Sequence, residues 1–235
     1  MVYVAVGVLI GAAGFIAIYE PDPPETVVFE TVYAKGTNSV PLLIELLQRR
    51  DSTLKKKLIE WSEIHPRWGL HLRSASENHF LAARGFKILG TNAAFAALEL
   101  IRTCRANFSE PGVTEYVRQI LDELGPESLS PLYASLQTER IADVEFRCWE
   151  IYSIITIETN SDKLVTLLVQ SLGDTNANVR QFAATGARVM KVSEGMNLAI
   201  PALQIAAADS NQLVSYNAAI ALKRLETNAR DQGKK

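Results

Sequence analysis

The three histidines of the chain lie in or beside a tryptophan-containing stretch at residues 60–78. A metal site would use His65, His71 and His79, with Glu63 as a fourth ligand. No two of these histidines have the i, i+4 spacing that places two ligands on one helical face, and neither cysteine is near them in the sequence. We therefore expect no bound metal.

The same stretch has the composition of a packed loop or of a protein contact. Trp61 and Trp68 are large apolar side chains that fold a loop onto its neighbours, whereas Arg67 and Arg73 stay solvated. A cluster of exposed tryptophan and arginine is also typical of the residues that dominate binding between proteins. The sequence leaves both interpretations open, and loop packing is the simpler one.

The groups that carry out covalent catalysis are not arranged for it. The chain has no G-x-S-x-G turn and no glycine-rich phosphate loop, and its two cysteines, Cys104 and Cys148, have no histidine beside them. The adjacent carboxylates Asp122 and Glu123 point in different directions on a helix, so they do not form a pair. The sequence predicts no catalytic residue, no cofactor and no enzymatic activity.

Five positive charges lie within nine residues, shortly before the tryptophan-containing stretch. Such a cluster contacts anionic lipid headgroups when it faces a membrane surface, at about 1 kcal/mol per charge. Nucleic-acid binding is not expected, because 24 basic and 26 acidic residues leave a formal net charge of −2. A solvated corner between helices is the simplest interpretation. The five residues are Arg49, Arg50, Lys55, Lys56 and Lys57.

The elements that position these residues repeat along the chain. The motif GTN occurs at residues 36–38 and again at 90–92, and each copy leads into an apolar helix. Glycine suits the end of one segment and asparagine the cap of the next helix. Later copies open with proline, which belongs in a first helical turn. The equivalent positions Pro41, Phe95, Pro131, Thr166 and Pro201 are 54, 36, 35 and 35 residues apart, so the first interval contains an insertion.

A second set of helices alternates with the first. Each has apolar residues spaced along one helical face, and four carry arginine at a matching position (Arg84, Arg118, Arg147 and Arg180). Two amphipathic helices per unit cannot bury their apolar faces alone, so the units must stack into an α-solenoid. An irregular helical domain is the alternative. The second helices are predicted at 81–90, 115–125, 144–155, 179–190 and 214–225.

The most regular units resemble HEAT repeats. The resemblance is good over 162–226, moderate over 77–160 and loose over 36–66. It implies an all-α fold, a right-handed α-solenoid of about five HEAT-like helix pairs, and a scaffolding role without catalytic residues. The start of the chain is also similar to uncharacterised bacterial membrane-anchored HEAT-repeat proteins. The matching residues are Leu168, Leu172, Asp174, Val179, Arg180, Ala183 and Ala184, then Leu203, Asp209, Val214, Ala218 and Ala219.

In the HEAT family an aspartate and an arginine link neighbouring turns into a ladder along the solenoid. The resemblance assigns this structural role to Asp174, Arg180 and Asp209. In the last unit Ser215 stands at the arginine position. We therefore expect the ladder to weaken near that end.

The N-terminal segment has the composition of a membrane anchor. Residues 2–19 are continuously apolar and uncharged, and 18 helical residues reach roughly 27 Å, enough to cross a hydrocarbon core. A cleaved signal peptide is the alternative, but no basic residue precedes the run and no A-x-A site closes it. We expect one transmembrane helix ahead of the repeats. Gly7 and Gly11 form a G-x-x-x-G pair through which two anchors would self-associate.

An acidic, proline-rich spacer separates this anchor from the repeats. Proline cannot continue a helix and favours extended backbone. We divide the chain into an anchor or signal segment at 1–19, a spacer at 20–35, a HEAT-like domain at 36–226 with an insertion near 60–78, and a polar tail at 227–235. The flanking charges leave the side of the membrane open, and we expect the repeats on the extracytoplasmic side.

These features predict a non-enzymatic scaffold, tethered to a membrane, that presents a curved surface to a protein or peptide partner. One alternative is an enzyme of the HEAT type, either similar to a bilin lyase or acting on nucleic acid. The other is a structural spacer without a specific partner. The candidate partner-binding residues are Glu45, Gln48, Trp61, Trp68, Glu99, Arg102, Gln137, Gln170 and Gln204.

Overall fold

The computed structural model describes most of the chain. From residue 23 onward, every regular element in the described ranges is helical. The all-α class predicted from the sequence is therefore confirmed for this part of the molecule. The described residues are 7–10, 16–19, 23–64, 72–110, 112–138, 143–158, 162–190 and 194–232.

The described residues nearest the N-terminus form a short hairpin. Strand β1 (Gly7–Ile10) pairs antiparallel with β2 (Ile16–Tyr19). Valine, isoleucine and tyrosine, which recur in these strands, have high strand propensity. The transmembrane helix predicted for residues 2–19 falls partly on this hairpin and otherwise outside the described residues. Within the described ranges, no helix combines the length and the apolar character that a bilayer span requires.

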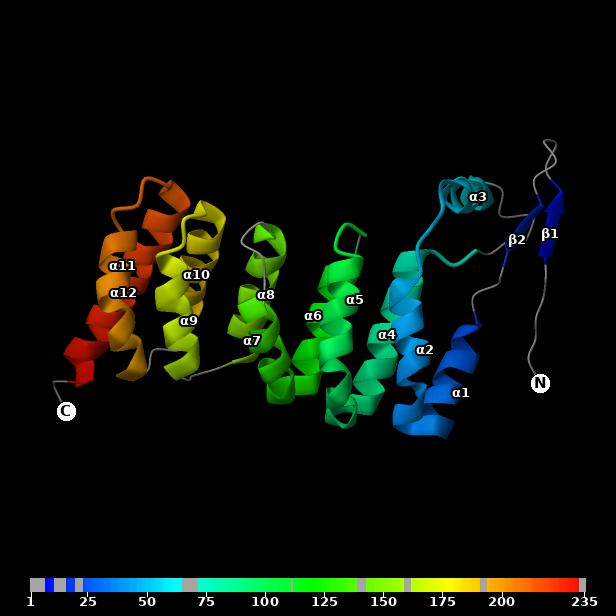
Figure 1. The fold of residues 1–235 in the computed structure, drawn as a ribbon, viewed down its shortest axis with the longest axis horizontal. Helices are drawn as coiled ribbons and strands as arrows, with labels where there is room; N and C mark the ends of the chain where they lie inside the picture. The colour runs from blue at the N-terminus through cyan, green and yellow to red at the C-terminus, as the bar shows by residue number, and fades with distance from the viewer. Residues whose placement is uncertain are drawn as a thin grey trace.

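The helices follow one another in a single row, with the first near one end and the last near the other (Figure 1). Four of them are preceded by 3₁₀ turns, η1 (Gly36–Ser39), η3 (Gly90–Ala96), η4 (Gly125–Ser128) and η5 (Glu194–Ala199). The helices are α1 (Glu25–Lys35), α2 (Val40–Gln48), α3 (Thr53–Ile64), α4 (Ala75–Leu89), α5 (Ala97–Ala106), α6 (Val113–Leu124), α7 (Leu129–Thr138), α8 (Val144–Ile157), α9 (Asp162–Leu172), α10 (Ala177–Val189), α11 (Ile200–Ala206) and α12 (Gln212–Gln232).

The GTN motifs lie at helix ends, and the predicted role of their glycine is confirmed. Gly36 and Gly90 have φ of 52° and 54°, in the left-handed region where glycine is favoured, and they end α1 and α4. The predicted role of asparagine is wrong, because Asn38 and Asn92 lie inside η1 and η3 and cap neither. Each 3₁₀ turn then runs directly into the next helix.

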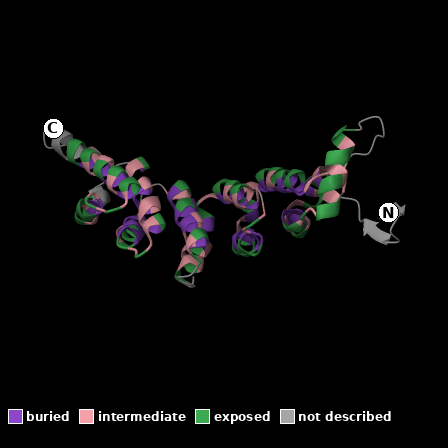
Figure 2. Ribbon diagram, turned by 90° about the horizontal axis from the view of Figure 1, so that it is seen from above, coloured by how far each residue is buried: buried purple, intermediate pink, exposed green. Residues whose placement is uncertain are grey.

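The row has two layers that enclose one continuous apolar core. The first layer consists of α2, α5, α7, α9 and α11, and the second layer of α4, α6, α8, α10 and α12. Each helix of the first layer pairs with the next one of the second layer, which gives five pairs, with α3 inserted inside the first pair. Figure 2 shows both layers from above, with buried residues along the row.

Helix α1 changes the predicted division of the chain. Val28 and Val32, one helical turn apart, are buried against the core, and α1 packs on α4. The extended spacer predicted for residues 20–35 therefore does not reach residue 35, and the helical row begins at α1. At the other end α12 continues to Gln232, so the tail predicted from residue 227 begins inside a helix.

Candidate functional site

Ion pairs join the last three helix pairs through their loops. Arg147 on α8 pairs with Asp174, which precedes α10. Arg180 on α10 contacts Asp209, which precedes α12, through Nε at 2.7 Å and Nη2 at 3.1 Å. Arg180 also donates to the Asp174 carbonyl at 2.9 Å. The structure therefore places Asp174, Arg180 and Asp209 in one ladder, with Arg147 as an additional member.

The direction of this ladder explains the role of Ser215. Each arginine pairs with the aspartate of the following helix pair, so the serine removes a link beyond Asp209 and not the link to it. The Arg180 guanidinium lowers the pKa of the Asp209 carboxyl by hydrogen bonding. Among the described residues, the last ladder link is therefore the one from Arg180 to Asp209, and the effect of Ser215 on the end of the ladder stays a prediction.

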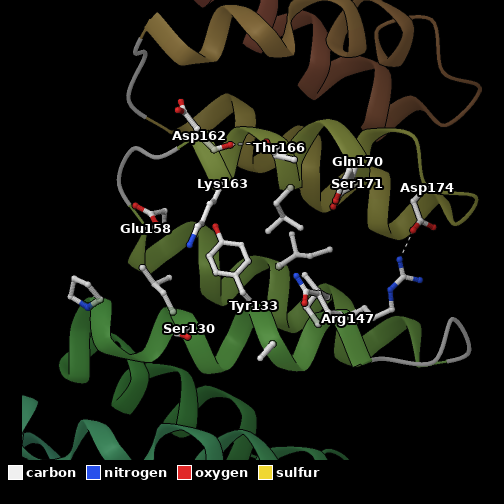
Figure 3. A pocket seen from close by; sticks show the side chains of 17 residues that line it. Ser130, Tyr133, Arg147, Glu158, Asp162, Lys163, Thr166, Gln170, Ser171 and Asp174 are labelled. Carbon is white, nitrogen blue, oxygen red and sulfur yellow. Dashed lines mark hydrogen bonds and ion pairs between the residues drawn. The ribbon is translucent and has the colours of Figure 1, made fainter.

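A cleft of about 980 Å³ lies between α7 and α9 (Figure 3). In the first layer α5 packs on α7, and α9 packs on α11, but the described residues of α7 and α9 do not pack closely. In the second layer α8 and α10 remain in contact. The residues that line the cleft are Pro126, Leu129, Ser130, Tyr133, Ala134, Leu136, Gln137, Arg147, Ile151, Glu158, Asp162, Lys163, Thr166, Leu167, Gln170, Ser171 and Asp174.

The walls of the cleft combine apolar and uncharged polar side chains. Leu136 on α7 and Leu167 on α9 face it, with Ile151 of α8 at its base. Gln137 and Gln170, which occupy the two walls, are exposed. Neither amide has a hydrogen-bonding partner among the described residues. Such a surface suits a ligand that has both apolar side chains and polar main-chain groups.

Charged residues lie at both ends of the cleft (Figure 3). At one end the Arg147–Asp174 ion pair neutralises itself. At the other end the lining includes Glu158, Asp162 and Lys163, that is, two carboxylates and one ammonium group. The cleft is therefore slightly acidic at the Glu158 end.

A buried carboxyl group lies on the far side of α8 from solvent. Glu150 is fully buried. Burial raises the pKa of its carboxyl to about 7, although the nearby Ser135 hydroxyl and the charges of Arg105 and Arg147 act in the opposite direction. Glu150 is not among the site residues predicted from the sequence. The position of Glu150 in the sequence indicates its burial. It is four residues after Phe146 and four before Ile154, which are both on the buried face of the helix.

The cleft brings together two of the predicted partner-binding residues, Gln137 and Gln170, and Glu99 pairs with Arg102 on α5 at 3.6 Å. The others lie on separate parts of the row. Gln48 donates a long hydrogen bond of 3.5 Å to Thr103, and Trp61 on α3 is 38% exposed. Trp68 lies outside the described residues. Glu45, Glu99, Arg102 and Gln204 are exposed on α2, α5 and α11, away from the cleft.

Most of the predicted basic cluster is used in local contacts. Arg49 pairs with Glu45 at 2.7 Å, and Lys55 pairs with Asp51 at 3.0 Å. Arg50 donates to the Asn107 side chain and to the Ala106 carbonyl. Lys56 and Lys57 are exposed on α3. A polyanion would therefore have to compete for three of the five charges.

The remaining candidates for chemistry are buried. His79 is fully buried, its Nε2 lies 3.0 Å from the Arg49 carbonyl oxygen, and burial lowers the pKa of its imidazole. His65 and His71 lie outside the described residues. Both thiols are free and buried, and burial raises the pKa of Cys104 and Cys148. In the described ranges, no three histidine, cysteine or acidic side chains gather as metal ligands.

Comparison with known proteins adds no assignment to this geometry. No family model, no curated protein and no solved structure matches this chain.

Proposed function

We propose that this protein is a non-enzymatic scaffold that binds a protein or peptide partner in the cleft between α7 and α9. The observation that carries the proposal is the opening of the first layer at this one junction, while the second layer stays packed. Its volume of about 980 Å³ lies at the upper end of the range for ligand pockets. Side chains from three helices converge there.

The proposed architecture is a right-handed HEAT-like α-solenoid. Five stacked helix pairs and the Arg147–Asp174 and Arg180–Asp209 ion pairs support it. In a solenoid each pair contacts only its neighbours, so one junction can open while the rest of the row stays packed. This property suits a binding cleft between two units.

The scaffold is proposed to be tethered to a membrane by residues 2–19 and to face the extracytoplasmic side. The uncharged apolar composition of this segment supports the tether. An arginine in such a segment costs about 2.5–3.5 kcal/mol on insertion scales.

Position-dependent crosslinking tests the binding proposal. A photo-crosslinking amino acid is placed in the full chain at Gln137 or Gln170, with exposed Gln212 on α12 as the control position. We expect the same partner to crosslink at both cleft positions and not at Gln212. Absence of crosslinks at the cleft, or the same products at all three positions, would contradict the proposal and favour a structural spacer.

Alkaline carbonate extraction tests the tether. The wild-type chain should stay with the membrane pellet, whereas a Leu9→Arg, Ile16→Arg double variant should move to the supernatant. Val27→Arg, on the exposed side of α1, is the matched control and should remain in the pellet. Release of the wild-type chain by carbonate would contradict the tether without affecting the test of the cleft.

A further inference from the structure

We infer that the α7–α9 cleft binds an extended peptide segment that carries a lysine or arginine at the end next to Glu158 and Asp162. The inference rests on the proposed function, because it names the chemistry of the partner for the same cleft. It follows from three features of the lining, which are the free amides, the apolar base and the unequal charge at the two ends.

The two glutamine side chains favour an extended backbone. Gln137 and Gln170 belong to opposite walls, and each amide presents two N–H donors and one carbonyl acceptor. An extended peptide has main-chain N–H and C=O groups available for such bonds. A helix already satisfies nearly all of these groups internally. Free amides on both walls are therefore more useful to an extended segment than to a helix.

The apolar residues between the walls favour side chains that alternate along the ligand. Leu136 of α7, Ile151 of α8 and Leu167 of α9 are part of the lining. Alternate side chains of an extended segment point to opposite sides. One set would therefore contact these three residues, while the peptide backbone stays level with the glutamine amides.

The charged residues at the two ends of the cleft then determine the direction in which the peptide lies and the residue that is favoured at one end. Arg147 and Asp174 neutralise each other at one end. Glu158 and Asp162 outnumber Lys163 at the other end (Figure 3). Electrostatic complementarity gives specificity and register to an interface. A basic side chain at this end of the cleft is favoured by the excess of one negative charge, whereas an acidic side chain there is repelled.

Peptide selection on the full chain in detergent micelles tests the inference. The probe is a phage-displayed library of random seven-residue peptides. Selection is repeated on a Glu158→Gln, Asp162→Asn double variant. A Glu30→Gln, Glu60→Gln double variant is the control, because it removes the same charge from exposed positions outside the cleft. We expect the wild type and the control to enrich peptides with lysine or arginine at one fixed position.

The strongest peptide is then synthesised with a fluorescent label. Its Kd should rise roughly tenfold on the Glu158→Gln, Asp162→Asn variant, a change of one decade in affinity. Replacing the basic residue of the peptide with norleucine should raise the Kd on wild-type protein by the same factor. This second measurement does not depend on how well the variant folds. Gln137→Ala with Gln170→Ala should also weaken binding, whereas Gln204→Ala should not.

Other results would overturn the inference. Enrichment of acidic or uncharged peptides, or an unchanged Kd after norleucine replacement, would show that the Glu158 end does not select a basic residue. Failure to enrich any cleft-dependent peptide would overturn it as well. The crosslinking at Gln137 and Gln170 is independent of peptide charge, so it distinguishes failure of this inference from failure of the proposed function.

Discussion

The same arginine position is used differently in the two parts of the row. In the N-terminal part, Arg84 pairs with Glu25 of α1 at 2.8 Å and stacks on the Phe29 ring at 4.6 Å. From α8 onward, Arg147 and Arg180 reach the aspartate of the next helix pair, and the Arg147 pair crosses into the C-terminal part. The helical repeat therefore places the arginine at the same position of these second-layer helices. The segments around each helix differ, and they determine which acidic residue pairs with the arginine.

Arg118 lies between these two arrangements. It contacts Glu115 and Asp122 of its own helix, at 2.7 and 2.8 Å, and lies 5.7 Å from the Tyr152 ring of α8. It belongs to the α5–α6 pair, which packs on the α7–α8 pair that borders the open junction between α7 and α9. Across that junction the connections described are the α8–α10 contact and the Arg147–Asp174 ion pair. The C-terminal helices α9–α12 are thus attached mainly through one layer.

The largest expected effect concerns whether the helices on the two sides of the open junction unfold independently of each other. Leu203 on α11 is fully buried, and Leu203→Ala should lower the free energy of unfolding by about 2–5 kcal/mol. Because stacked pairs interact mainly with their neighbours, amide protection should fall first in α9–α12. Hydrogen exchange measured helix by helix checks this.

Leu121→Ala on α6 provides the matched change in the N-terminal part, because Leu121 is also fully buried. In the Leu121→Ala variant, amide protection should fall first in helices α4–α8. If both variants lose protection uniformly from α1 to α12, the two parts form one cooperative unit and the comparison fails.

The second effect is a pH dependence of the N-terminal part. The pKa of Glu150 is about 7 in the folded protein, against an ordinary 4.5. Between these values the folded state holds a proton that the unfolded state releases. The free energy of unfolding should therefore fall as the pH rises from about 4.5 to about 7, by about 3 kcal/mol. The groups described around Glu150 are Ser135, Arg105, Arg147 and Cys104.

Urea unfolding at pH 5, 6, 7 and 8 measures this slope. Glu150→Gln should abolish the fall, because glutamine does not titrate, and should leave the rise in stability with pH that the lowered pKa of buried His79 produces. Glu99→Gln on the exposed side of α5 should leave the wild-type pH dependence unchanged. A fall that persists in Glu150→Gln would show that another group titrates in this range.

The third effect tests close helix packing in both parts. Gly186 on α10 lies against Ile155 of α8, and an added Cβ would overlap the Cδ1 atom of Ile155. Gly85 on α4 has the same relation to Leu43 of α2. Valine at either position should lower the free energy of unfolding by about 1–3 kcal/mol, because it overpacks the contact.

Gly173→Ala is the control for these variants. The nearest atom to its Cβ would be the Gln170 carbonyl oxygen at 3.6 Å, an ordinary contact. Thermal unfolding should show little change for this variant. Equal losses at all three glycines would mean that close approach of the helices is not the cause.

The helix pairs could be predicted because their signal is local. The apolar face that includes Val179 and Ala183 recurs in each second-layer helix, and proline or glycine marks the start of the first-layer helices. Helix α1 was missed because its preceding prolines indicated extended backbone, and two buried valines gave a weak apolar pattern.

The cleft could not be predicted in the same way. Gln137 and Gln170 are ordinary exposed residues in the sequence, and their relation depends on the separation of α7 and α9. That separation is set by packing between pairs, which leaves no fixed spacing along the chain. The buried Glu150 was predictable in principle from its helical face, but an acidic residue there competes with the expectation that charge is exposed.

The smallest expected effect tests the arginine comparison itself. Arg180 and Asp209 are 18% and 11% exposed, whereas Arg84 and Glu25 are 49% and 52% exposed. Arg180→Ala removes the two hydrogen bonds to Asp209 and the two to the Asp174 and Thr175 carbonyls. Asp209 stays bonded to the Asn211 N–H, so the loss should be about 1–3 kcal/mol. Arg84→Ala should cost less than about 1 kcal/mol, because solvent screens an exposed pair.

Urea unfolding at low and high salt separates the two arginines. Salt should reduce the contribution of Arg84 more than that of Arg180, since screening acts mainly on exposed charges. Arg180→Lys keeps the charge but lacks the planar fork that contacts both Asp209 oxygens, so it should restore only part of the loss. If Arg180→Lys restored the full free energy of unfolding, the contribution of the ladder would come from charge alone. Equal losses for Arg84→Ala and Arg180→Ala would remove the distinction between the two parts of the row.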